Sequence, residues 1–111
     1  MERKKIKDRL FGKYGVILTS ENESEALEFP AFLQPLRYKN KIYLSGVPTE
    51  LGYDGLNKYL LIAPFSVDKK YLTGADYTIR FGEESFSADH CEPVYLGKRP
   101  LYYWAIVHKE G

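Results

Sequence analysis

The chain has 111 residues, the length of one domain, and a domain of this size buries roughly two-thirds of the surface of its unfolded chain. Charged residues make up 28% and hydrophobic residues 44% of the sequence, as in ordinary globular proteins. The formal net charge of +1 argues against a dedicated nucleic-acid-binding protein. A single cysteine excludes an internal disulfide and fits a reducing compartment. No apolar run approaches the roughly twenty residues that cross a bilayer, and the basic N-terminus lacks a signal peptide's apolar stretch, so we expect a soluble cytoplasmic protein.

The chain opens with a basic segment that predicts a short docking helix over residues 2–11. Ile6 and Leu10, four residues apart, form a narrow apolar stripe with Phe11, so this helix would be stable only when docked. Gly12 and Gly15 would end it. A charge run such as ERKKIKDR is typical of a solvated helix face. The cations of this region are Arg3, Lys4, Lys5, Lys7, Arg9 and Lys13.

Short strands follow the basic segment. Residues 14–19 alternate, with Val16 and Leu18 on one face, and residues 26–36 resume an extended pattern after an acidic turn. Pro30 and Pro35 indicate that this second strand lies at a sheet edge or carries a bulge. Residues 58–63 are apolar on both faces, which is typical of a strand buried on both sides.

The second half of the chain predicts hairpins. Residues 68–73 form one helical turn in this interpretation, and residues 75–81 form a strand with Tyr77, Ile79 and Phe81 facing inward. Gly82-Glu83 makes a hairpin turn, and the return strand passes through residues 86–88 until Pro93 interrupts it. Residues 94–96 continue that strand, and a turn over residues 97–99 leads to the last one.

That final strand, over residues 101–108, is the most hydrophobic element of the chain and has no polar face. A core strand of a small closed barrel fits this pattern better than an open, half-exposed sheet. We therefore predict a single domain, residues 1–111, that is mainly β: a small closed or partly closed antiparallel β-barrel with a short N-terminal helix and a long inserted loop.

The inserted loop covers residues 37–57 and follows neither helical nor strand periodicity, although residues 41–44 could form a brief strand. Structureless segments of this length are uncommon in compact domains and are usually functional or disordered. This one is too aromatic for a disordered linker. We expect it to have a function that depends on contacts with other molecules.

The sequence contains no recognisable active site. Asp89-His90-Cys91 places a nucleophile beside a base, but neighbouring residues of a strand point to opposite faces, which argues against a catalytic dyad. The only other imidazole is His108, and a zinc site would need further ligands at suitable spacing. No phosphate-binding glycine motif or nucleophile elbow occurs. We expect a protein that is not an enzyme and that needs no metal or cofactor.

Binding of single-stranded nucleic acid is the alternative function. Small barrels bind single strands by stacking bases on exposed aromatic residues, and Tyr38, Tyr43 and Tyr53 lie in the long loop beside Lys39 and Lys41. Against this, most aromatic residues fall at inward strand positions, and carboxylates stand near the far end of the loop, where a phosphate-binding groove would not place them. These carboxylates belong to Glu50 and Asp54.

The order of these features resembles the small head-completion (stopper) proteins and head–tail connector proteins of long-tailed bacteriophages and prophages. The resemblance lies in an extended strand ending in Gln34-Pro35, the long loop that follows at once, the strand KYLLIAP closed by Pro64, the hairpin YTIRFGEESF, and the final segments EPVYL and LYYWAIVHKEG. The block FLQPLRYKNKIYLSGVPTELGY also resembles prophage proteins encoded among head–tail joining genes. The basic N-terminal segment departs from the stopper pattern.

The resemblance implies a structural protein of the virion neck, assembled in the host cytoplasm. Copies would join as a homo-oligomeric ring at the exit of the portal and adaptor, next to tail-completion proteins, although the isolated chain would be a monomer. The 37–57 loop would gate DNA passage without specific DNA binding. Its channel-loop candidates are Tyr38, Lys39, Lys41, Tyr43, Glu50, Leu51, Tyr53 and Asp54. Because a ring requires two complementary patches, the ring-contact candidates are basic Lys4, Lys5, Lys7 and Arg9 and acidic Glu21, Glu23 and Glu25.

Overall fold

The computed structural model describes residues 2–36, 41–44, 47–50, 58–73 and 76–110, of which residue 2 and the strands between 41 and 50 are described by their backbone. The elements in chain order are β1 (Glu2–Lys5), α1 (Arg9–Tyr14), β2 (Val16–Glu21), β3 (Glu25–Pro35), β4 (Lys41–Leu44), β5 (Val47–Glu50), β6 (Lys58–Pro64), the 3-10 helix η1 (Lys69–Leu72), β7 (Thr78–Phe81), β8 (Glu84–Leu96) and β9 (Arg99–Glu110).

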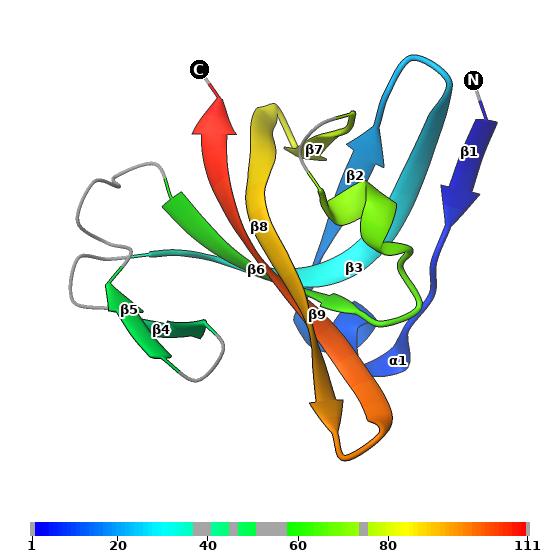
Figure 1. The fold of residues 1–111 in the computed structure, drawn as a ribbon. Coiled ribbons are helices and arrows are strands. Elements are labelled where there is room, and N and C mark those ends of the chain that lie inside the picture. The colour runs from blue at the N-terminus through cyan, green and yellow to red at the C-terminus, as the bar shows by residue number, and fades with distance from the viewer. Residues whose placement is uncertain (1, 37–40, 45–46, 51–57, 74–75, 111) are drawn as a thin grey trace.

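Six antiparallel strands form a closed barrel in the order β3-β2-β7-β8-β9-β6, and the pairing of β3 with β6 completes the ring (Figure 1). β1 lies outside this ring and runs parallel to the first half of β3. β4 and β5 form a separate two-stranded sheet. The prediction of a mainly β protein built as a small closed antiparallel barrel is therefore confirmed.

The barrel is filled by the inward-facing side chains of its strands. Phe29 and Phe86 are fully buried, and both segments that looked apolar on two faces, β6 and β9, supply core residues. η1 packs Leu72 into the same core, and the carbonyl of Tyr71 accepts a hydrogen bond of 2.7 Å from the buried Ser20 hydroxyl. This bond satisfies the one buried polar side chain found among the described residues.

The predicted helix over residues 2–11 is wrong in its position. Residues 2–5 form β1 because their backbone pairs with β3, and the helix begins only at Arg9. Asp8 is its N-cap: its side chain accepts a hydrogen bond of 3.0 Å from the Phe11 N–H. Gly15 ends the helix, as predicted, whereas Gly12 lies within it. Strand pairing with a distant segment has therefore overridden the local helical pattern.

Three expectations based on local sequence are also corrected. β3 is not an edge strand, because β2 pairs with one side of it, and β1 and β6 pair with successive parts of the other side. Pro30 lies between the part paired with β1 and the part paired with β6. Pro93 does not interrupt its strand, since β8 continues from residue 84 to 96 with two irregularities in register. Phe81, expected to face inward, is 40% exposed. The turns at Gly82 and Gly97 are confirmed, and both glycines have positive φ angles of 60° and 62°.

Candidate functional site

The barrel closes at the base of the 37–57 segment. β3 and β6 are antiparallel neighbours, with Phe32 opposite Ile62 and Pro35 opposite Tyr59. Beyond the last pair, the Leu36 N–H donates a hydrogen bond of 2.9 Å to the Lys58 carbonyl. The segment therefore leaves one strand and returns to its direct neighbour, and the barrel's ring of strands is complete without it.

Within this segment the structure describes two strands, of which only the first was expected. β4 and β5 pair with each other, and Figure 1 shows them standing to one side of the barrel. Of the channel-loop candidates, Lys41 and Glu50 are direct partners across this ladder, and Tyr43 lies opposite Pro48. Tyr38, Lys39, Leu51, Tyr53 and Asp54 lie outside the described residues.

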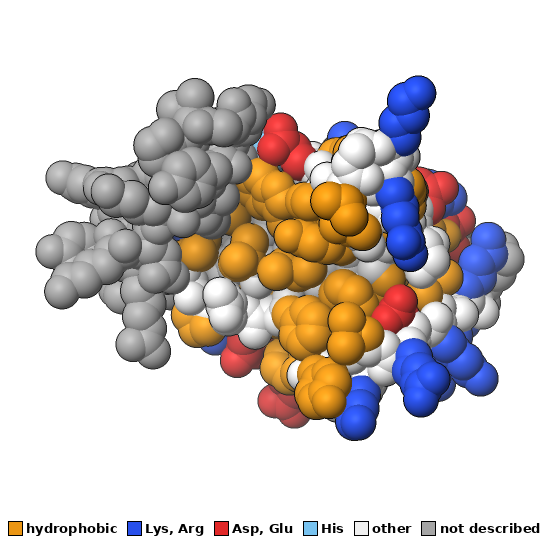
Figure 2. All heavy atoms as spheres, turned by 90° about the horizontal axis from the view of Figure 1, so that it is seen from below, with side chains coloured by type: hydrophobic (Ala, Val, Ile, Leu, Met, Phe, Trp, Pro, Cys, Tyr) orange, Lys and Arg blue, Asp and Glu red, His pale blue; other side chains and the backbone are white. Residues whose placement is uncertain are grey.

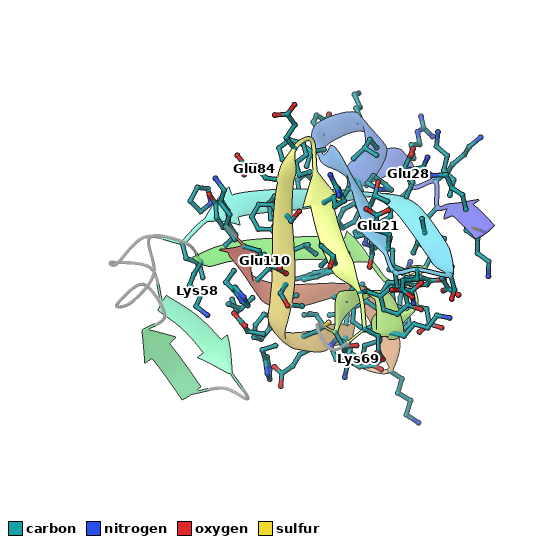
Figure 3. All side chains as sticks on the ribbon, turned by 90° about the horizontal axis from the view of Figure 1, so that it is seen from above. Glu21, Glu28, Lys58, Lys69, Glu84 and Glu110 are labelled. Atoms are coloured by element: carbon teal, nitrogen blue, oxygen red, sulfur yellow. The ribbon has the colours of Figure 1, made fainter. Side chains whose placement is uncertain are left out.

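A charged cluster on the barrel wall borders this segment. Lys58, the first residue of β6, donates a hydrogen bond of 2.6 Å from Nζ to Asp89 Oδ2, and His108 Nδ1 lies 2.8 Å from Asp89 Oδ1. Figure 3 shows Lys58 on the side of the barrel nearest the β4–β5 hairpin. Burial raises the pKa of Asp89, but the hydrogen bonds from Lys58 and His108 outweigh it, so the pKa lies below its usual value. The sequence gives no sign of this cluster because its members come from three strands.

In the neighbouring Asp89-His90-Cys91 segment of β8, the side chains of His90 and Cys91 lie in different environments. The register of β8 against β9 passes from Ala88 to His90, so Asp89 is the extra residue of a β-bulge. His90 is exposed, with Nε2 at 3.4 Å from Glu92 Oε1, whereas Cys91 is buried. Burial raises the pKa of the Cys91 thiol to about 11, which keeps it protonated and unreactive near neutral pH.

A second cluster joins the start of β3 to η1 and to the residue that precedes β7. Glu25 Oε1 accepts hydrogen bonds from the hydroxyls of Tyr71 at 2.5 Å and Tyr77 at 3.0 Å, and Lys70 Nζ lies 3.2 Å away. The hydrogen bonds from Tyr71 and Tyr77 lower the pKa of Glu25 to about 2, although burial opposes them. Glu25, a ring-contact candidate, is thus engaged within its own subunit.

Beside this cluster lies an open hollow of about 630 Å³, which we name the acidic hollow. Its charged lining consists of three carboxylates, Glu21, Glu23 and Asp76, and one ammonium, Lys70. Glu21 pairs with Arg80 at 3.4 Å, and Lys70 pairs with Glu25. Within the described part of the chain, Glu23 and Asp76 have no cationic partner. The remaining lining residues are Asn22, Ser24, Thr73, Tyr77 and Thr78.

Of the basic ring-contact candidates, Lys4 and Lys5 lie on β1, on the opposite side of β3 from β2. Lys7 lies between β1 and α1, and Arg9 is the first residue of α1. Lys5 pairs with Glu28 at 3.5 Å, and both side chains belong to adjacent parallel strands. Lys7 and Arg9 are exposed. The basic candidates of β1 and the acidic candidate Glu25 of β3 therefore lie on adjacent strands.

Among the residues that the structure describes, no group of three or more His, Cys, Asp or Glu side chains is arranged to hold a metal ion. No helix in the described ranges has the length and apolarity needed to cross a bilayer. Comparison of the chain with protein-family models, with curated proteins and with solved structures found no match.

Proposed function

We propose that this chain is a structural head–tail joining protein of a tailed phage or prophage, of the stopper or neighbouring neck type. Copies form a ring at the exit of the portal and adaptor, against the tail-completion proteins, and the 37–57 segment gates the release of DNA. The isolated chain is a monomer at micromolar concentration. The proposal rests on the sequence resemblance and on the arrangement of the barrel around that segment.

The observation that carries the proposal is the closure of the barrel between β3 and β6. A gate must change position without unfolding the subunit that bears it, and such changes occur in segments whose ends are fixed by a rigid frame. Here the frame is hydrogen-bonded up to Leu36 and from Lys58 onward. β4 and β5 pair with each other, and neither pairs with another strand in the part of the chain that the structure describes.

Deletion of residues 40–55 from the protein in assembling particles tests the gate. Five residues, 37–39 and 56–57, remain between Leu36 and Lys58, which are hydrogen-bonded to each other, and hairpin loops of 3–5 residues are common. We expect the shortened protein to fold and join the neck while the particles lose packaged DNA. A variant with residues 40–55 replaced by Gly and Ser at equal length is the control for length, and it too should leak. Full DNA retention by both variants would refute the gate.

Binding to single-stranded DNA separates this proposal from the alternative. In fluorescence anisotropy at low salt, a connector protein gives little binding. Micromolar binding that weakens steeply with salt is the sign of phosphate contacts, and it would favour a nucleic-acid-binding barrel.

A further inference from the structure

One end of the barrel carries an exposed apolar surface, which we name the lower face. Figure 2 shows hydrophobic side chains gathered on this underside, where Figure 1 places α1 and the β8–β9 turn. Contiguous apolar surface of this kind marks interaction sites on soluble proteins. The most exposed member, Leu96, is 68% accessible. We define the lower face by the exposed large hydrophobic residues of the elements that reach this end, which are Leu10 and Tyr14 of α1, Ile17 of β2, Tyr95 and Leu96 of β8, and Leu101 of β9.

The β8–β9 turn projects from this face as a rigid, positively charged tip. It is the lowest point of the molecule in Figure 1 and carries exposed Lys98 and Arg99 beside Gly97. The ring of Tyr95 lies 6.1 Å from that of Phe65, which stacks on Tyr103 at 4.9 Å, so the base of the turn is held by aromatic packing. Lys98 and Arg99 have no ion-pair partner within the described residues, and Figure 2 shows further Lys and Arg side chains at the margin of the face.

An acidic surface lies at the opposite end of the same barrel, where the basic strand β1 also begins. The β2–β3 turn, the β7–β8 turn and the end of β9 all lie there (Figure 1). The acidic hollow opens at this end, and its lining has a net charge of −2, from Glu21, Glu23 and Asp76 against Lys70. A projecting tip with two cations thus matches an open hollow with two excess carboxylates.

We propose that the β8–β9 turn of one copy docks into the acidic hollow of a second copy. Lys98 and Arg99 would face Glu23 and Asp76, the two lining acids without a cationic partner. The contact joins different surfaces of identical subunits, and such heterologous contacts form a ring when the rotation from copy to copy closes and an open filament when it does not. The inference rests on the proposed ring and names the surfaces that build it.

The contact depends on few charges, all of them exposed, so it is weak in dilute solution and weakens further as salt is added. A pre-formed platform that holds copies side by side would raise their effective concentration and complete the ring. This is consistent with an isolated chain that is monomeric at micromolar concentration.

Sedimentation velocity at millimolar concentration and low salt tests the contact with paired charge reversals. One variant carries Lys98→Glu and Arg99→Glu, and the other carries Glu23→Lys and Asp76→Lys; all four residues are exposed, so folding should be unaffected. The control reverses Glu83→Lys and Glu110→Lys, which lie at the acidic end but outside the hollow. We expect each test variant to lose more than about tenfold in association constant, and an equimolar mixture of the two to recover it.

Absence of association by the wild-type protein at millimolar concentration would overturn the proposal. The proposal would also be overturned if the Lys98→Glu, Arg99→Glu variant lost self-association while the Glu23→Lys, Asp76→Lys variant kept it. That result would mean that two lower faces contact each other. Binding of anionic lipid vesicles that depends on Lys98 and Arg99, without self-association, would assign the face to a membrane. The DNA-retention test is separate. If the wild-type protein associates as proposed but particles with either loop variant retain their DNA fully, this contact stands and the gating function is refuted.

Discussion

Tyr71 donates its hydroxyl hydrogen bond to Glu25 over 2.5 Å, from 46 residues further along the chain. Tyr77 donates a second bond to the same oxygen, and Lys70 completes the cluster. Together they fasten the short 3-10 helix and the residue that precedes β7 to the start of β3. The acidic hollow is therefore bounded by a rigid wall rather than by independent loops.

The first prediction concerns acid stability. Because the pKa of Glu25 falls from 4.5 to about 2 on folding, its ionised form stabilises the native state above pH 4.5, and this contribution is lost as the pH falls toward 2. Wild-type protein and Glu25→Gln are compared by thermal unfolding across this range. We expect the wild-type midpoint to be higher at neutral pH and the difference to shrink toward pH 2. A difference that is constant with pH would show that ionisation of Glu25 does not contribute.

The second prediction uses two glycines of the same helical region. A Cβ at Gly15 would lie 2.4 Å from the Ala31 carbonyl oxygen, a backbone atom that cannot move aside, whereas at Gly12 no other described atom outside the helix lies within 4 Å. Gly15→Ala should lower the free energy of unfolding by roughly 1–3 kcal/mol. Its matched control, Gly12→Ala, should raise it by about 0.5–1 kcal/mol, because alanine favours the helix. Urea titration measures both, and equal effects of the two substitutions would contradict the close approach of Gly15 to β3.

The third prediction concerns the thiol of Cys91. Its burial and its pKa of about 11 leave almost no thiolate at neutral pH. A thiol-specific reagent should react with the native protein far more slowly than with the protein in denaturant. Cys91→Ser should leave assembly unchanged. Rapid labelling of the native protein would contradict this prediction. Loss of assembly by a Cys91→Ser variant of native-like stability would likewise indicate that the thiol has a function.

The fourth prediction concerns the barrel without its inserted segment. Deletion of residues 40–55 shortens the connection between β3 and β6 about fourfold, and each halving of a loop reduces its closure cost by about 0.6 kcal/mol. The shortened chain should therefore fold and be at least as stable as the wild type, by about 1 kcal/mol. Circular dichroism and urea titration measure this. An unfolded deletion variant would show that residues 40–55 are an integral part of the fold.

Much of the fold could be predicted because the relevant signals are local. The hairpin turns at Gly82 and Gly97 follow from the conformational freedom of glycine, and the uninterrupted apolar pattern of residues 101–108 predicted a buried strand in a closed barrel. The strand over residues 2–5 could not be predicted in this way, because only its pairing with β3 makes it extended.

The candidate site, too, could be predicted only in part from the sequence. The sequence predicted the long insertion between two strands, but it gave no indication that those strands are neighbours, which makes the insertion separable from the barrel. The cluster of Lys58, Asp89 and His108 was missed because it combines residues from β6, β8 and β9 around a bulge. Bulges and cross-strand ion pairs depend on register, which the chain acquires only as its strands pair.

By itself, the sequence determined most of the extended segments, the chain reversals at Gly82 and Gly97, and that its apolar strands need a closed core. These properties follow from side-chain periodicity and glycine conformation, which act over a few residues. The tertiary structure alone decided that β3 meets β6, that Glu25 meets Tyr71, and that a basic, apolar tip and an acidic hollow stand at opposite ends of the barrel. Those relationships join residues far apart in the chain, and they depend on strand order and register, which short-range preferences do not encode.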